Sequence, residues 1–196
     1  MYHIQVFRNG AIGIRPRFGL GPPQGLSLRY FASQFNRQLV APFYDDIDTS
    51  AGGDITYRLI LNDNDTFNTI QQEISEQYPE LGDARPSLVC LATWYRVPPY
   101  HSIATPNNCN SFQVYIATNG TWSVVKFSYG IIQWATTSTL IGVSGDRAGL
   151  HITHPATRNI GALQQLRGSS VFYRIDDGTL LQLLHSSYLT TVQYCI

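Results

Sequence analysis

The chain has 196 residues, of which 43% are hydrophobic and 13% charged; this is ample apolar material for a core and excludes a disordered chain. Thirteen basic residues balance thirteen acidic ones, so no net field attracts nucleic acid or an anionic membrane surface, and neither partner is expected. No run approaches the ~20 apolar residues of a membrane span, and Arg8, Arg15 and Arg17 interrupt the N-terminal region, so neither membrane insertion nor a signal peptide is expected within these residues.

The N-terminal region predicts a β-hairpin followed by a loop. Alternation over residues 2–6, the Asn9-Gly10 pair and renewed alternation over 12–14 form the strongest short-range hairpin signal. Proline and glycine recur over residues 16–26, which predicts a loop, and strand character returns at 38–43.

One segment of the chain predicts a helix. It spans residues 66–78, where Phe67, Ile70, Ile74 and Tyr78 recur at helical spacing behind Asp65 or Thr66 as N-cap, and Pro79 ends it.

The other regular segments predict strands. They are residues 55–61, a long central strand at 87–97, a hairpin of 111–118 and 121–128 around Asn119-Gly120, a continuation at 131–136, and weaker strands at 139–143, 149–153, 170–175 and 188–196. Many short strands separated by turn signals favour a mainly β fold: an antiparallel two-layer β-sandwich-like domain with one α-helix.

Four segments carry a pattern more specific than strand periodicity. They are Ala41–Thr49 (APFYDDIDT), Ala92–Tyr100 (ATWYRVPPY), Asn110–Gly120 (NSFQVYIATNG) and Phe127–Trp134 (FSYGIIQW). In this order, with the predicted helix between the first two, they resemble the nidogen-like (NIDO) domain family. Tyr44 stands where that family usually has Trp, and Asp45 where it often has a small residue.

The resemblance runs from about residue 4 to about residue 177. We therefore expect a NIDO-like domain over residues 1–177 and a C-terminal strand extension over 178–196, paired with the same domain or with a neighbouring protomer. The resemblance implies an extracellular module, secreted or at the cell surface, with a structural or adhesive role, no catalysis and no required cofactor. Its expected partners are further copies of itself or other extracellular matrix glycoproteins.

Sequons and cysteines bear on the same location. Asn64 and Asn119 begin Asn-x-Thr sequons in polar turns, where a glycan could be attached.

Cys90, Cys109 and Cys195 form an odd set without metal-binding spacing. Cys90 lies in an apolar run typical of a buried thiol, which leaves Cys109 and Cys195 as the candidate disulfide, with Cys195 also placed to reach another chain.

An acidic cluster is the candidate metal site. Asp45, Asp46, Asp48 and Asp54 offer the hard oxygen ligands that calcium prefers. The alternative is that these carboxylates accept turn and backbone hydrogen bonds or pair with arginines such as Arg58.

Two other function classes remain open. A glycan- or protein-binding adhesion domain, calcium-dependent or not, could use an aromatic platform of Trp94, Tyr95, Tyr100, Trp122, Tyr129 and Trp134, although such residues are more often sheet core. Alternation places Trp94 and Tyr95 on opposite faces. A hydrolase is the more distant alternative, because no Gly-x-Ser-x-Gly or His-Glu-x-x-His motif accompanies the histidines.

Both ends of the chain predict strands that could serve self-association into a matrix, filament or cell coat. The candidate residues are Tyr2, Ile4, Val6, Tyr188, Thr190, Val192, Tyr194 and Ile196. An unpaired terminal strand can join the sheet edge of a neighbour. The alternative, that both ends pair within their own domain, is left open.

Overall fold

The computed structural model describes residues 2–14, 38–83, 85–102, 107–144, 151–175 and 189–195. For Tyr2, His3 and residues 189–195 it describes the backbone alone. The loop predicted at 16–26 and two self-association candidates, Tyr188 and Ile196, lie outside the described residues.

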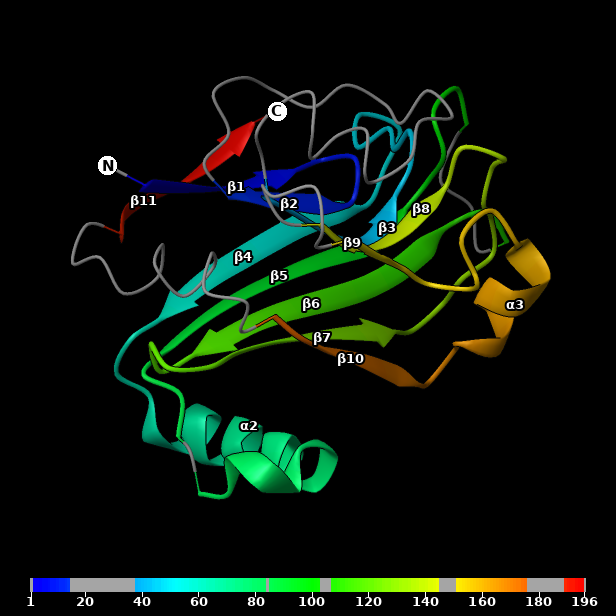
Figure 1. Cartoon of the computed structure of the whole chain (residues 1–196). Helices are drawn as coiled ribbons and strands as arrows, with labels where there is room; N and C mark the ends of the chain where they lie inside the picture. Colours follow the sequence, from blue (N-terminus) through cyan, green and yellow to red (C-terminus); the bar gives the residue numbers. More distant parts are fainter. Residues whose placement is uncertain are drawn as a thin grey trace.

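Two β-sheets lie face to face (Figure 1). The first has six strands in the order β11-β1-β2-β3-β8-β9, and the second has five in the order β10-β7-β6-β5-β4. Their bounds are β1 Tyr2–Phe7, β2 Ala11–Ile14, β3 Gln38–Tyr44, β4 Asp54–Ile60, β5 Leu88–Val97, β6 Asn110–Thr118, β7 Ser123–Tyr129, β8 Leu140–Ser144, β9 His151–Thr153, β10 Ser170–Arg174 and β11 Leu189–Cys195. Neighbouring strands are antiparallel except β1 and β11, which are parallel. The predicted mainly β, two-layer fold is confirmed.

The main core fills the space between the sheets. Alternation along β5 turns Cys90, Ala92 and Trp94 inward, and they pack with Phe43 of β3 and Phe112 of β6. The rings of Trp94 and Phe112 are stacked with centroids 5.1 Å apart, and the Trp94 Nε1–H donates to the Phe7 carbonyl oxygen at 3.1 Å. This bond ties the buried indole of one sheet to the backbone of the other.

The predicted Asn9-Gly10 hairpin joins β1 and β2. Gly10 has φ +81, and a Cβ at this position would lie 1.8 Å from the Phe43 carbonyl oxygen of β3. Glycine is required here both by the left-handed backbone and by the close approach of the next strand.

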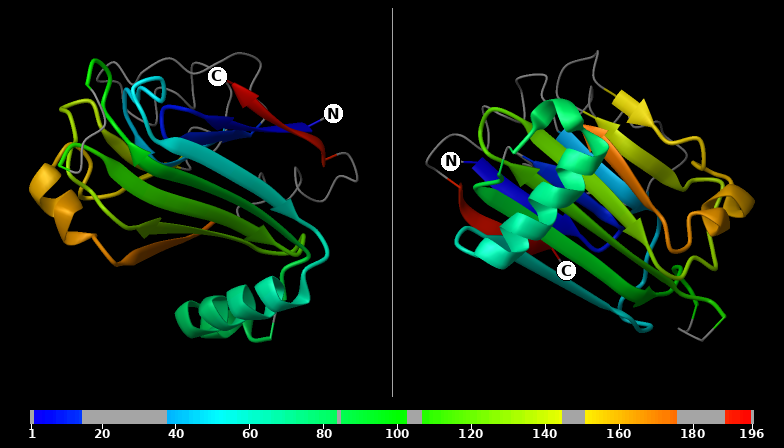
Figure 2. Two further views of the ribbon diagram at one scale, coloured as in Figure 1. Left: turned by 180° about the vertical axis from the view of Figure 1, so that it is seen from behind. Right: turned by 90° about the horizontal axis from the view of Figure 1, so that it is seen from below.

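Helix α2 (Asn64–Gln77) lies on the outer face of the five-stranded sheet (Figure 2). It buries Phe67, Ile70 and Ile74 against that face, as its spacing predicts. It begins two residues before the predicted start, because the Asp63 carboxylate, rather than Asp65 or Thr66, caps it by accepting the Thr66 N–H at 3.0 Å. A short 3₁₀ helix, Pro79–Leu81, follows.

Three details differ from the predictions. No strand forms over residues 131–136: the Asn110 side chain accepts the backbone N–H groups of Gln133 (2.7 Å) and Trp134 (3.2 Å), so a side chain takes the place of a strand ladder. A six-residue helix, α3 (Ile160–Gln165), was not predicted; Asn159 caps it. The strand predicted as central at residues 87–97 is β5, which lies inside the five-stranded sheet, but the middle strand of that sheet is β6.

The two ends of the chain lie side by side. β1 pairs on one side with β2 and on the other with β11, Ile4 standing opposite Val192 and Val6 opposite Tyr194. Both edges of β1 are therefore used within the chain, while β11 forms an edge of the six-stranded sheet. Of the two arrangements that the sequence left open, the structure has the one in which both ends pair within their own domain.

Candidate functional site

Asp45, directly after β3, is only 1% exposed. Its carboxylate accepts bonds from the Thr136 hydroxyl (2.9 Å) and N–H (3.1 Å), from the Thr139 hydroxyl, and from the Asp46 N–H (2.8 Å). A carboxylate has about four acceptor sites, and these donors occupy them. Asp45 thus connects the end of β3 to the turn at 136–139.

Asp48 and Asp54 make local bonds of the kind that the alternative to a metal site predicts. The Asp48 carboxylate accepts the Ser50 N–H (3.0 Å) and hydroxyl (2.5 Å), and the hydroxyl bond is the main reason that the pKa of Asp48 is lowered. The Asp54 carboxylate accepts the Ile55 N–H at 2.8 Å.

Asp46 is half-buried beside this group. Burial raises its pKa, and the neighbouring Asp45 carboxylate raises it further, while Arg8 and His101 act in the opposite direction. Among the residues that the structure describes, no three His, Cys, Asp or Glu side chains are grouped so that they could hold a metal ion. The calcium site stays a prediction, which thermal melting with and without calcium tests, because binding to the native state raises the midpoint.

Both sequons lie at the surface. Asn64 is the exposed first residue of α2 and its Oδ1 accepts from Arg85 at 2.6 Å. Asn119 lies in the β6–β7 turn, where its Oδ1 accepts the Thr121 N–H at 2.9 Å and hydroxyl at 2.7 Å. These bonds use the amide oxygen, whereas a glycan is attached to the nitrogen. Glycosylation at Asn64 and Asn119 stays a prediction.

The cysteines do not form a disulfide in the described part of the chain. Cys90 is fully buried in the main core, as predicted, and burial raises the pKa of its thiol to about 12. Cys109 is also a buried free thiol, with its Sγ 3.5 Å from the Gln133 side-chain oxygen. The side chain of Cys195 lies outside the described residues, so the predicted Cys109–Cys195 pairing is not confirmed.

The predicted aromatic platform is mostly core. Trp94 is fully buried and Tyr95 is 58% exposed, which confirms that the two point to opposite faces. Trp122 and Tyr129 are buried, and Tyr100 is exposed with its ring against His101, the centroids 3.8 Å apart. Trp134 is half-buried and its Nε1–H donates to the Val97 carbonyl oxygen at 3.0 Å, so the exposed rings of this set are those of Tyr95 and Tyr100.

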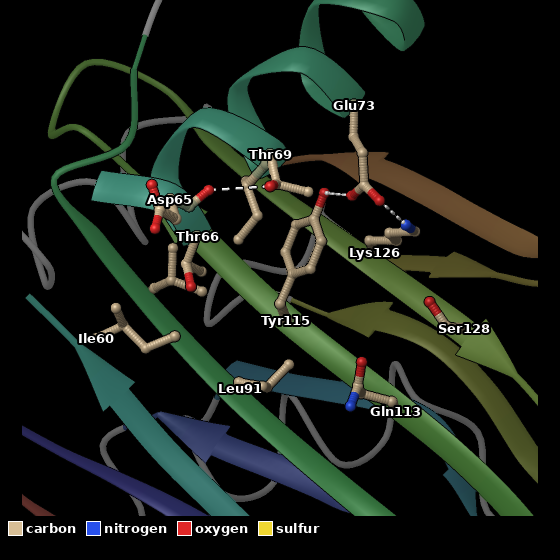
Figure 3. Close-up of a pocket in the computed structure, with 12 residues that line it drawn as sticks. Ile60, Asp65, Thr66, Thr69, Glu73, Leu91, Gln113, Tyr115, Lys126 and Ser128 are labelled. Carbon is tan, nitrogen blue, oxygen red and sulfur yellow. Dashed lines mark hydrogen bonds and ion pairs between the residues drawn. The ribbon is translucent and has the colours of Figure 1, made fainter. Parts of the chain in front are cut away.

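A cavity of about 350 Å³ lies between α2 and the outer face of the five-stranded sheet (Figure 3). Ile60, Val89 and Leu91 contribute apolar atoms from the sheet, and Thr66 and Thr69 line it from the helix. An apolar floor with a polar wall suits an amphipathic group such as a peptide side chain or a sugar ring.

Three residues form the polar wall at one end of this cavity. The Lys126 Nζ lies 2.6 Å from Glu73 Oε1, and the Tyr115 hydroxyl donates to Glu73 Oε2 at 3.0 Å (Figure 3). The ammonium group also lies 5.7 Å from the centre of the Tyr115 ring and 5.4 Å from that of Phe172. Burial, and then the neighbouring Glu73, raise the pKa of Tyr115, so its hydroxyl stays protonated and donates.

Sequence reasoning did not find this group. Glu73 and Lys126 are 53 residues apart, and their meeting depends on which face of the sheet α2 covers. The available signal was the only lysine of the chain, placed between the apolar Val125 and Phe127 of the strand of residues 123–129.

Comparisons with known proteins agree with the four sequence segments. Residues 3–157 match the nidogen-like domain (NIDO) family. Alpha-tectorin of Gallus gallus is 28% identical over 133 residues, 68% of this chain, and the alpha-tectorins of Mus musculus and Homo sapiens are each 27% identical over 100 residues, 51% of this chain. The chain spans 6% of the length of the first of these relatives and 4% of the other two. No solved structure matches it.

The matched segment ends at residue 157, after β9. β10 lies beyond it yet pairs with β7, so the five-stranded sheet continues past the match. The domain boundary at residue 177 stays a prediction. Among the described residues, no helix combines the length and the hydrophobicity that crossing a bilayer requires.

Proposed function

The chain belongs to the nidogen-like domain family, and from this membership we propose that it is an extracellular structural or adhesive module that associates with itself in a matrix, filament or cell coat. The observation that supports this most is the family match over residues 3–157, together with the alpha-tectorin relatives. These suggest an extracellular matrix module, with a structural rather than a catalytic role.

The surface composition supports self-association. Equal numbers of acidic and basic residues, only 13% of the chain charged, leave little electrostatic repulsion between copies. Such a surface tolerates close packing against like neighbours or against other matrix glycoproteins.

The C-terminal strand is the proposed attachment element. β11 forms one edge of the six-stranded sheet, and no described strand pairs with its outer side. An edge strand presents unpaired N–H and C=O groups to which a neighbouring chain can add. Cys195, the last residue of β11, is the proposed covalent lock between protomers.

Deletion of residues 186–196 tests this proposal. The full chain, purified without reductant, is expected to form filaments or higher oligomers visible by electron microscopy, whereas the deletion variant is expected to stay folded and to form neither. Far-UV circular dichroism and a cooperative thermal transition establish that the variant folds. Unchanged assembly of a folded deletion variant would exclude β11 as the attachment element.

A second candidate function is ligand binding. The cavity beneath α2 and the exposed rings of Tyr95 and Tyr100 favour it. A glycan array probed with the wild-type chain and with a Tyr95→Ala, Tyr100→Ala variant tests it. Binding that the variant loses supports a glycan-binding role, and no binding by the wild-type chain contradicts it.

A further inference from the structure

The edges of the two sheets differ in how open they are to another strand. β9 has three residues and β10 five, and Arg174 of β10 pairs with Glu80 at 2.9 Å. β4 has seven residues and pairs with β5 in an unbroken register from Asp54 to Ile60, without a bulge. It borders the five-stranded sheet (Figure 2), and no described strand lies on its outer side.

β4 has few of the features that usually protect an edge, its two charged residues being Asp54 and Arg58. Its sequence, DITYRLI, contains no proline and no lysine, and it is rich in β-branched and aromatic residues. Tyr57, at the middle of the strand, is 42% exposed although it points to the same face as the inward Ala92 of β5. A long, regular edge of this kind, with Ile55, Tyr57 and Leu59 on its inner face, is suited to pairing with another strand.

The strand is complementary to a second copy of itself. In an antiparallel pair of two copies, both inner faces lie on the same side of the joined sheet only if odd-numbered residues stand opposite odd-numbered ones and even opposite even. The twofold axis must then pass between one residue and the same residue of the second copy. An axis at Tyr57 pairs all seven residues: Tyr57 with its counterpart, Ile55 with Leu59, Thr56 with Arg58, and Asp54 with Ile60. Any other axis leaves part of β4 unpaired.

The resulting contacts are favourable on both faces. On the inner face, the two tyrosine rings meet at the axis, flanked by two pairs of Ile55 and Leu59, and aromatic and aliphatic cross-strand pairs stabilise sheets. On the outer face, Asp54 is the diagonal neighbour of Arg58 in the second copy, within reach of a long side chain. The two arginines approach each other near the axis, but each has Asp63 of its own chain 3.6 Å away.

From this complementarity we propose that β4 is a homotypic interface, in which two copies of the chain pair antiparallel about Tyr57 and join their five-stranded sheets into one sheet of ten strands. The proposal rests on the proposed self-association and adds a second surface to it. With β11 at one edge of one sheet and β4 at an edge of the other, each copy has two attachment surfaces, and alternation of the two contacts extends a chain of copies beyond a dimer.

A charge exchange tests the pairing. In a chain lacking residues 186–196, which removes the β11 contact, the dimer dissociation constant is measured by sedimentation velocity. Arg58→Glu places an acid beside Asp54 of the second copy and is expected to weaken the dimer at least ~10-fold. Asp54→Arg alone is also expected to weaken it, and the double exchange, Asp54→Arg with Arg58→Glu, is expected to restore it. Arg167→Glu, exposed after α3, makes the same change of net charge and is expected to leave the constant unchanged.

A cross-linking test in the full chain does not depend on the deletion. Tyr57→Cys, in a Cys195→Ser background, places two thiols at the axis and is expected to give a covalent dimer on mild oxidation. Leu61→Cys is the matched control: it is 53% exposed just past the strand, but in this pairing it lies eight positions, roughly 27 Å, from its counterpart. A Leu61→Cys dimer equal in yield to the Tyr57→Cys dimer would overturn the proposal.

The outcomes separate this inference from the proposed function. A wild-type chain that is monomeric at all concentrations refutes self-association as a whole. A wild-type chain that assembles, with Arg58→Glu unchanged and no Tyr57→Cys cross-link, refutes the β4 interface alone. Weakening by each single exchange, restoration by the double exchange and a selective Tyr57→Cys cross-link establish it.

Discussion

The two faces of the five-stranded sheet are covered in different ways. On the inner face, the stacked Trp94 and Phe112 fill the space between the sheets, and two side chains of this core donate to backbone carbonyls of the other sheet: Trp94 to Phe7 and Tyr129 to Pro42 (2.8 Å). On the outer face, α2 packs Phe67, Ile70 and Ile74 against the sheet, and a charged pair, Glu73 and Lys126, links the two beside a cavity of about 350 Å³.

This difference indicates which layer holds the fold together and which leaves room for contacts. A neutral side chain that bonds to a backbone carbonyl across two sheets is satisfied without a solvation cost for charge. A partly exposed ion pair beside a cavity is expected to contribute less to stability than such packing. The inner face is therefore expected to contribute more to stability, and the outer face, with its cavity, is the candidate binding surface.

The largest effect is expected from Trp94→Ala. It removes a fully buried indole, its stacking on Phe112 and its bond to the other sheet, so we expect a loss of about 3–5 kcal/mol in the free energy of unfolding. Urea unfolding measures it. Tyr95→Ala, one residue along on the outer face, is the control and is expected to stay within about 0.5 kcal/mol of wild type. Equal losses in the two variants would contradict the comparison.

A smaller effect is expected from the pair that links α2 to the sheet. A double-mutant cycle of Glu73→Gln and Lys126→Met is expected to give a coupling energy of about 1 kcal/mol, because the Lys126 side chain is only 15% exposed and that of Glu73 33%.

The control for this cycle is the more exposed pair of Glu80 and Arg174, 2.9 Å apart, for which a coupling below about 0.5 kcal/mol is expected. Both cycles are measured by urea unfolding in the same buffer. If the two coupling energies are equal, burial beside the cavity adds nothing to the Glu73–Lys126 pair.

The smallest effect is expected at the exposed cap of α2. The bond from the Thr66 N–H, and then that from its hydroxyl, lower the pKa of Asp63 below its ordinary value of 3.8. A lowered folded-state pKa contributes stability that is present above the unfolded value and is lost as the pH falls through the folded value.

Asp63→Ala is therefore expected to lower the thermal midpoint at about pH 7, by an amount that shrinks toward about pH 2. Asp65→Ala removes a carboxylate from the same helical turn but leaves the capping bond, and a smaller decrease is expected. A decrease for Asp63→Ala that does not vary with pH would show that the charge of the cap is unimportant.

Local patterns in the chain predicted much of this fold. Alternation placed Trp94 and Tyr95 on opposite faces, Asn9-Gly10 and Asn119-Gly120 marked two hairpins, and one apolar stripe marked α2. Each of these depends on neighbours within a few positions, where backbone geometry alone decides which side chains share a face.

The candidate site could not be predicted in the same way. The role of Asp45 was left between a metal ligand and a hydrogen-bond acceptor, and its donors, Thr136 and Thr139, lie more than 90 positions away. The strand expected at 131–136 was lost to the Asn110 side chain, 23 positions away. Whether a side chain or a neighbouring strand accepts these hydrogen bonds depends on which distant segments pack together.

The sequence by itself determined the class of fold, the positions of the hairpins and the one long helix, since strand and helix periodicities are local consequences of backbone geometry. Only the tertiary structure decided that β11 lies parallel to β1, that α2 covers the outer face of the second sheet, and that β4 remains at its edge. The physical reason is that sheet order and layer contacts are set by burial and hydrogen bonding between distant segments, which no local pattern encodes.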